Sequence, residues 1–179
     1  MIIVCYGDSN TWGYDPRDVF GEPYNYCWPD ILGEISGFSV RNEGVNGRQI
    51  PDYPYAPPSD TDLLAVMLGT NDLLQGKKPE EVCHKMEEFM ASIPISRDRI
   101  LLIAPPPMKL GQWVPSQELI EESVRLADGY RQLSARLCIH YANAGQWNIP
   151  LTFDGVHFTE EGHRIFAHNL YQYLINCAR

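Results

Sequence analysis

Short apolar segments alternate with longer amphipathic segments along most of the chain. Segments 63–68 and 100–104 contain only apolar residues, with no polar residue in between. Such runs are typical of strands that are covered on both faces, as in a parallel sheet. Together with three other runs, they predict strands at 2–6, 38–40, 63–68, 100–104 and 137–142.

Several intervening segments have the periodicity of helices that are buried on one side. One begins at Pro79, with acidic residues in its first turn, and its apolar face comprises Val82, Met86, Phe89, Met90 and Ile93. A second starts near Ser116 and places Ile120, Val124, Ala127, Tyr130, Leu133 and Leu137 on one side. A third follows Thr159 as N-cap and buries Ile165, Phe166, Leu170 and Leu174. A shorter helix is expected over 28–35. This alternation predicts an α/β fold with a parallel, doubly wound sheet.

Polar segments rich in small residues follow the first three predicted strands. They are Gly-Asp-Ser-Asn-Thr-Trp-Gly at 7–13, Asn-Glu-Gly-Val-Asn-Gly-Arg at 42–48 and Gly-Thr-Asn-Asp at 69–72. A fourth, Asp-Gly-Val-His at 154–157, precedes the last helix. Functional sites of such sheets lie outside the carboxyl ends of the strands. We therefore expect these four segments to meet at one edge.

Together the four segments contain the groups that acyl transfer requires. Ser9, on a tight turn, is a nucleophile once a base removes its proton, and His157 is a suitable base. Asp154 lies three residues earlier and can orient the imidazole. The N–H of Ser9, the N–H of a glycine in the second segment and the amide of Asn71 can stabilise an oxyanion.

Each segment also has a common structural explanation. Turn serines, Asx turns and surface histidines are frequent without any catalytic role. The occurrence of all four in this order favours the functional interpretation.

The segments carry a resemblance to a known family. Gly7-Asp8-Ser9, Gly69-Thr70-Asn71-Asp72 and Asp154-Gly155-Val156-His157 resemble three sequence blocks of the SGNH hydrolases, the GDSL-type esterases and lipases. Residues 11–13, 43–48, 67–72 and 105–107 are most similar to the arylesterase and acyltransferase branch. The resemblance implies a single domain over 1–179, a flavodoxin-like α/β/α fold with a five-stranded parallel sheet and helices on both faces, and no metal or organic cofactor.

The resemblance also implies roles for individual residues. The oxyanion glycine of the family lies five residues after the asparagine that ends the second strand, which gives Gly47 rather than Gly44. Asn10 replaces the apolar residue that usually follows the serine, and it either lines the pocket or braces the turn. Trp12 and Arg48 are further candidates for substrate binding, although a paired or solvated Arg48 is an equal alternative.

Further residues have expected roles outside the four segments' acyl-transfer chemistry. Asp8 is expected to brace the serine turn rather than carry a proton. One or two of the loop side chains are expected to line the acyl or alcohol pocket, or else to lie in a subunit contact: Trp12, Tyr53, Tyr55, Met108 and Trp113.

Composition narrows the class of protein. The chain has 179 residues, 44% of them apolar and 21% charged, which fits one globular domain. The net charge of −9 disfavours nucleic acid and anionic membranes as partners. The five scattered cysteines indicate reduced, mostly buried thiols, and residues 1–6 have no signal-peptide pattern, so a cytoplasmic protein is expected.

The leading hypothesis is a serine esterase that hydrolyses small acyl esters through a Ser9 acyl-enzyme. A carbohydrate O-deacetylase, a thioesterase and a lysophospholipase of the same family stay open as alternatives, as does a homo-oligomer. From other classes, a flavodoxin-like phosphate-binding module and a non-catalytic family member are the competitors.

Overall fold

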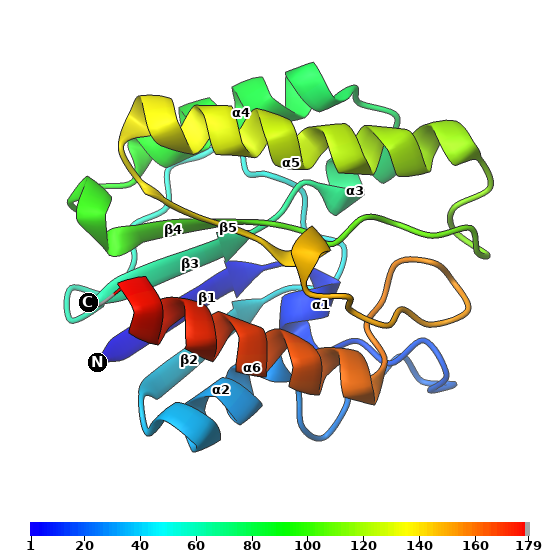
Figure 1. Ribbon diagram of the computed structural model, residues 1–179, viewed down its shortest axis with the longest axis horizontal. Helices are drawn as coiled ribbons and strands as arrows, with labels where there is room; N and C mark the ends of the chain where they lie inside the picture. The colour runs from blue at the N-terminus through cyan, green and yellow to red at the C-terminus, as the bar shows by residue number, and fades with distance from the viewer. Residues whose placement is uncertain (178–179) are drawn as a thin grey trace.

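The computed structural model describes residues 1–177, and its centre is one five-stranded parallel sheet (Figure 1). The strand order is β2-β1-β3-β4-β5. The strands are β1 (Ile2–Gly7), β2 (Ser39–Gly44), β3 (Leu63–Met67), β4 (Ile100–Ala104) and β5 (His140–Asn143). Because β2 and β3 lie on opposite sides of β1, the order reverses there, which is where ligands bind in open α/β sheets.

Helices cover both faces of the sheet, which gives the expected three layers (Figure 1). One face carries α2 (Trp28–Ser36) and α6 (Glu160–Cys177). The other carries α3 (Thr70–Leu74), α4 (Pro79–Ser92) and α5 (Gln117–Leu137). The short helices are α1 (Ser9–Trp12), η1 (Arg97–Arg99) and η2 (Ala144–Gln146).

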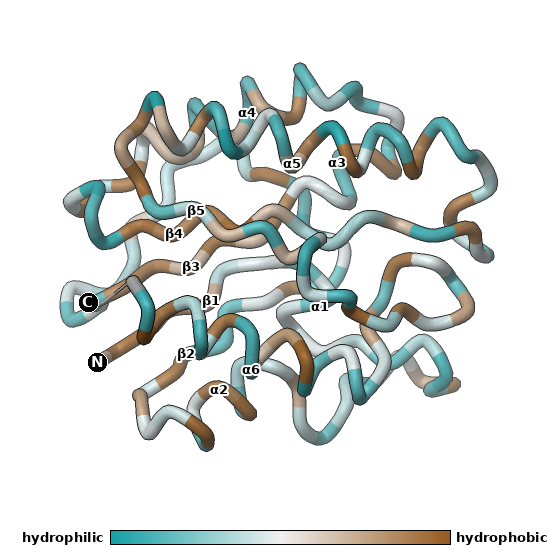
Figure 2. Tube along the Cα trace, viewed as in Figure 1, coloured by the Kyte–Doolittle hydropathy of each residue, from teal (hydrophilic) through white to brown (hydrophobic). Residues whose placement is uncertain are grey.

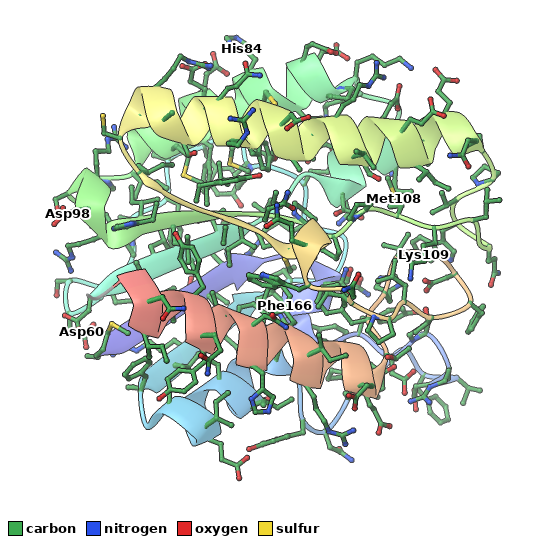
Figure 3. All side chains as sticks on the ribbon, viewed as in Figure 1. Asp60, His84, Asp98, Met108, Lys109 and Phe166 are labelled. Atoms are coloured by element: carbon green, nitrogen blue, oxygen red, sulfur yellow. The ribbon has the colours of Figure 1, made fainter. Side chains whose placement is uncertain are left out.

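Successive residues of each central strand point into two separate cores. Val4 and Val66 belong to the core beneath α4 and α5, whereas Ile3 and Ala65 belong to the core beneath α2 and α6. This is why β3 and β4 contain only apolar residues, and Figure 2 shows both strands in hydrophobic colours. Phe166 of α6, labelled in Figure 3, is fully buried in the second core.

The helix starts agree with the sequence. Pro79 opens α4, and Ser116 accepts a hydrogen bond from the backbone N–H of Leu119 at 3.3 Å. Thr159 accepts one from the N–H of Gly162 at 3.0 Å before α6. These caps satisfy donors that have no partner inside the helix.

The second strand differs from its prediction. It runs to Gly44 rather than ending at Val40, and it pairs with β1 up to Gly7. As an edge strand it is only partly covered, so polar Arg41 and Glu43 occupy positions that lack an apolar signal.

The fifth strand and the buried face of α5 also differ from their predictions. Helix α5 continues to Leu137, and Cys138 ends it in a left-handed conformation with φ of 54°. The strand therefore starts at His140 instead of residue 137. Val124 is 48% exposed, because the buried face of α5 instead includes Leu126.

Within residues 1–177, no helix combines the length and the hydropathy that crossing a bilayer requires. Cys5 and Cys27 are buried, Cys83 is partly buried and Cys138 is exposed, so the expectation of mostly buried thiols holds for some of them only. The side chain of Cys177 lies outside the described part.

Candidate active site

The nucleophile candidate lies where β1 ends and α1 begins, at the carboxyl edge of the sheet. Asp8 is the N-cap of α1, and its carboxylate accepts a hydrogen bond from the N–H of Asn10 at 3.0 Å. Burial raises the pKa of Asp8 to about 6, although that hydrogen bond opposes the rise. These contacts agree with the bracing role expected for Asp8. Ser9 is the first residue of α1, so its own N–H has no acceptor within the helix.

Ser9, His157 and Asp154 form a chain of hydrogen bonds. Nε2 of His157 lies 3.0 Å from Oγ of Ser9, and Nδ1 lies 2.6 Å from Oδ2 of Asp154. All three side chains are buried. Because the ionised carboxylate of Asp154 accepts a hydrogen bond from the N–H at Nδ1, Nε2 of the neutral imidazole is free to accept the serine hydroxyl proton.

The loop of residues 152–157 fixes the carboxylate of Asp154. Its Oδ1 accepts hydrogen bonds from Oγ1 of Thr152 at 2.8 Å and from the N–H groups of Val156 and His157 at 2.9 and 3.0 Å. Burial acts to raise the pKa of Asp154, but the hydrogen bonds from His157 and Val156 outweigh it and hold this pKa well below its usual range. The carboxylate therefore stays charged beside His157.

Residues 45–48 form a β-turn that we name the oxyanion turn, after the role that the sequence predicts for Gly47. The N–H of Arg48 donates to the carbonyl of Val45 at 3.1 Å, and Gly47 has a φ of 74°. This φ suits the third residue of a type II turn, a position that favours glycine. The side-chain amide of Asn71 donates to the carbonyl of Arg48 at 3.1 Å, so Gly47 and Asn71 lie at the same turn.

The oxyanion turn is hydrogen-bonded to the end of β1 and lies next to α1. The N–H of Val45 donates to the carbonyl of Gly7 at 3.1 Å, two residues before Ser9. At Gly44, a Cβ atom would overlap the backbone of Trp12, so only glycine permits this close packing. Gly44 is thus the strand-end residue that the sequence predicts.

Asn10 contacts the backbone on both sides of His157. Its Nδ2 donates to the carbonyl of Val156 at 3.1 Å, and its Oδ1 accepts from the N–H of Phe158 at 2.9 Å. Of the two roles considered for Asn10, these contacts favour bracing over pocket lining.

The side chain of Arg48 contacts the backbone and an aromatic ring of the protein itself. Its Nη1 donates to the carbonyls of Gly7 and Glu43 at 3.1 and 2.5 Å, and its guanidinium lies 4.1 Å from the ring centre of Tyr6. These contacts favour the paired alternative over substrate binding.

Two of the loop side chains expected to line the pocket or a subunit contact instead make contacts inside the fold. Met108, labelled in Figure 3, is buried in the core, and Tyr55 donates to Glu43 while packing on Tyr6. Trp113 instead approaches His157, with ring centres 5.6 Å apart. Trp12 stacks on Tyr14 at 6.4 Å.

Tyr14 has no assignment from the sequence, although its ring centre lies only 4.6 Å from that of His157. Its position directly after the Thr-Trp-Gly extension is the one signal that could have indicated it.

A groove extends from the oxyanion turn along α4. Two hollows of about 610 and 220 Å³ share the residues Pro51, Asp52, Tyr53 and Lys85 and so form one continuous surface, which we name the side groove. Its polar lining includes Asn46, Gln49 and Glu88.

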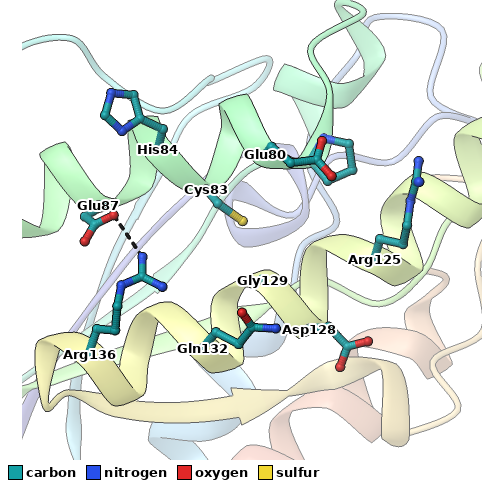
Figure 4. A pocket seen from close by; sticks show the side chains of 10 residues that line it. Glu80, Cys83, His84, Glu87, Arg125, Asp128, Gly129, Gln132 and Arg136 are labelled. Carbon is teal, nitrogen blue, oxygen red and sulfur yellow. Dashed lines mark hydrogen bonds and ion pairs between the residues drawn. The ribbon is translucent and has the colours of Figure 1, made fainter.

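A separate hollow of about 390 Å³ lies between α4 and α5 (Figure 4). Glu87 and Arg136 form an ion pair of 2.9 Å across it. Burial raises the pKa of Cys83 to about 11, so this thiol is a poor nucleophile near neutral pH.

The comparisons with known proteins agree with the fold. A model of the GDSL-like lipase/acylhydrolase family matches residues 5–165. The chain belongs to this family. Among curated proteins, no sequence matches this GDSL-like hydrolase.

Solved structures share its fold over nearly the whole chain. A carbohydrate acetylesterase family member from Sinorhizobium meliloti has a TM-score of 0.80 and 24% identity, covering 97% of this chain and 96% of that chain. The aryl esterase of M. smegmatis has a TM-score of 0.79 and 23% identity, covering 98% of both chains. A protein from Agrobacterium tumefaciens, provisionally assigned as an arylesterase, has a TM-score of 0.77 and 27% identity, also covering 98% of both.

Proposed function

We propose that this GDSL-like hydrolase is a serine esterase that cleaves small acyl esters through an acyl-enzyme on Ser9. The observation that carries the proposal is the buried hydrogen-bond chain Ser9–His157–Asp154, with distances of 3.0 and 2.6 Å. Nucleophile, base and orienting carboxylate are the arrangement that acyl transfer requires.

In the first step, Oγ of Ser9 forms a bond to the acyl carbon while its proton passes to Nε2 of His157. The electron pair of the carbonyl moves onto its oxygen, which becomes an oxyanion. When the tetrahedral intermediate collapses, the bond to the alcohol oxygen breaks, and His157 gives its proton to that oxygen. Water then repeats the sequence on the acyl-enzyme and releases the acid and free Ser9.

The oxyanion is stabilised by three N–H donors from three loops. These are the backbone N–H of Ser9, the backbone N–H of Gly47 and the side-chain amide of Asn71. Asn71 has two N–H bonds, and one of them is held by the carbonyl of Arg48, which fixes the direction of the other. Donors that are fixed before the reaction need no reorganisation when charge develops.

Two observations support a substrate class. The similarity to the A. tumefaciens protein, at 27% identity, supports placement in the arylesterase and acyltransferase branch, with aryl or short alkyl esters as substrates. The aromatic rings of Tyr14 and Trp113 near His157, with Trp12 stacked on Tyr14, suit an aryl leaving group.

A carbohydrate O-deacetylase is the second candidate. The side groove favours it, because exposed Tyr53 and the polar side chains of Asn46, Gln49 and Glu88 can hydrogen-bond and stack with a sugar. The S. meliloti neighbour is itself a carbohydrate acetylesterase family member.

The proposal is tested by labelling with a fluorophosphonate probe and by hydrolysis of p-nitrophenyl acetate. The wild type should incorporate one probe per chain, and Ser9→Ala should lose both the label and nearly all hydrolysis. Ser59→Ala changes an exposed serine outside the site and serves as the matched control. Full hydrolysis by folded Ser9→Ala, or labelling at another serine, would contradict the assignment, and binding of inorganic phosphate without hydrolysis would favour the phosphate-binding module.

A further inference from the structure

Two aromatic side chains lie directly against the imidazole of His157. The ring centre of Tyr14 is 4.6 Å away with the planes at 59°, and that of Trp113 is 5.6 Å away with the planes at 85°. Both distances lie within the range at which an aromatic ring attracts a cation. We name this pair the aromatic clamp.

Each ring of the aromatic clamp is anchored to a different member of the Ser9–His157–Asp154 chain. The backbone N–H of Tyr14 donates to the carbonyl oxygen of Ser9 at 3.0 Å. The backbone N–H of Trp113 donates to the carbonyl oxygen of Asp154 at 3.1 Å. These hydrogen bonds to Ser9 and Asp154 thus fix the backbone that carries each ring next to His157.

The loop that carries Trp113 is joined to the loop of Asp154 along its length. Lys109, labelled in Figure 3, donates its N–H to the carbonyl of Gly155 at 2.9 Å, and Gln112 donates to that of Phe153 at 3.3 Å. Gly111 packs so closely that a Cβ atom would overlap the backbone of Asp154. Trp113 is 49% exposed, yet its backbone is fixed before any substrate arrives.

The imidazole must carry a positive charge in a nearly dry place. The side chain of His157 is only 3% exposed, so water cannot solvate the imidazolium that forms when Ser9 loses its proton. The charged or titratable groups near it are Asp154, Asp8, the phenol of Tyr14 and His163. Burial lowers the pKa of His163 to about 3, so His163 stays neutral and adds no repulsion.

We propose that Tyr14 and Trp113 are positioning residues that hold the imidazole toward Ser9 and stabilise its imidazolium form through contact with their rings. The inference rests on the proposed function and adds two residues to it. The proton balance is unchanged: the proton moves from Ser9 to His157 and then to the leaving alcohol, and the rings lower the energy of the state between the two transfers.

The test replaces each ring and follows the pH dependence of kcat/KM for phenyl acetate and ethyl acetate. Tyr14→Leu and Trp113→Leu should each move the acid limb to lower pH by about half a unit, since imidazolium loses a stabilising partner. The kcat on the plateau should fall several-fold with both esters. Tyr14→Phe and Trp113→Phe keep a ring and should keep the acid limb, and Phe20→Leu, an exposed residue in the loop after Tyr14, is the matched control.

The two esters separate this role from simple binding of the substrate. An unchanged acid limb, with a raised KM for phenyl acetate alone, would show that the rings only bind the aryl leaving group and would overturn the inference. If Tyr14→Leu fails to fold, the half-exposed Trp113→Leu carries the test. Absence of Ser9-dependent hydrolysis in the wild type would instead overturn the proposed function, so the two failures are distinguishable.

Discussion

At the scale of single residues, the site depends on side chains whose hydrogen bonds go to backbone atoms rather than to solvent. Asn10 joins α1 to the His157 loop, and Arg48 joins the oxyanion turn to the end of β1. Their residue types alone suggest substrate contacts as readily as bracing. The sequence could not decide between these roles, because the partners are carbonyls distant in the chain.

Asn71 has the most specific expected effect among the single residues. If its amide meets charge only as the oxyanion develops, Asn71→Ala should lower kcat about 10²- to 10³-fold with little change in KM, measured with p-nitrophenyl acetate. Asn25→Ala, at an exposed asparagine outside the oxyanion turn, should leave both constants unchanged. A variant of Asn71 altered in KM only would mean that the amide binds the ground state.

At the scale of elements, the sequence predicts strands that are buried on both faces and misses parts of strands that are partly exposed. Strands β3 and β4 were predicted nearly to the residue, because both of their faces pack on helices. Edge strand β2 was predicted too short, because polar residues occupy its partly exposed positions. The ends of parallel strands then brought Ser9 and Asn71 to one edge, as expected.

The aromatic clamp shows where prediction from sequence ends. Tyr14 and Trp113 come from two loops, and their approach to His157 depends on backbone hydrogen bonds between those loops. Neither hydrophobic periodicity nor a local motif encodes such contacts, so Trp113 was one of several candidates and Tyr14 was not among them.

The contact between α2 and α6 should make stability depend on pH through His163. This fully buried side chain accepts a hydrogen bond from the N–H of Trp28 at 3.2 Å on Nδ1, and its Nε2 has no hydrogen-bond partner among the described residues. Burial lowers its pKa from 6.5 to about 3. Stability from the neutral ring is complete above pH 6.5 and is lost as the pH falls toward 3, at up to about 1.4 kcal/mol per pH unit.

Urea denaturation of the wild type and of His163→Gln between pH 4.5 and 7.5 measures this contribution. Gln is neutral throughout and keeps an acceptor for Trp28, so the wild type should lose its advantage over the variant as the pH falls. Asp8 acts in the opposite sense, because its pKa is raised to about 6 and its ionisation destabilises the fold as the pH rises. Only the difference between the two proteins therefore isolates His163, and parallel profiles would contradict the assignment.

At the scale of the whole molecule, the order of strands explains why the candidate site residues meet. Because β1 lies between β2 and β3, the segments after these three strands are neighbours at the carboxyl edge. The 154–157 segment reaches the same edge just before α6 returns along the sheet. Among residues 1–177, the larger irregular segments are connecting loops rich in Pro and aromatic residues.

The polar surface next to the candidate site predicts a limit on the length of the acyl chain. A long acyl chain gains about 0.8 kcal/mol per buried CH₂, but only where an apolar groove receives it. The side groove next to the oxyanion turn is instead lined by polar and charged side chains such as Asn46, Asp52 and Lys85. A short, stiff pocket discriminates by size, with each misplaced methylene costing about 1–3 kcal/mol. We therefore expect kcat/KM for p-nitrophenyl acetate and butyrate to exceed that for the decanoate at least about tenfold.

The measurement requires esters below their micelle concentrations, with Ser9→Ala as the blank for spontaneous hydrolysis. Two exposed apolar side chains offer a surface on which a long chain could lie if the limit failed. Leu110 and Phe153 are 65% and 59% exposed on the two loops that carry Trp113 and Asp154. A steady rise of kcat/KM up to the palmitate ester, abolished by Leu110→Ser and Phe153→Ser, would show that these side chains form an acyl-binding surface and that a lipase is the better description.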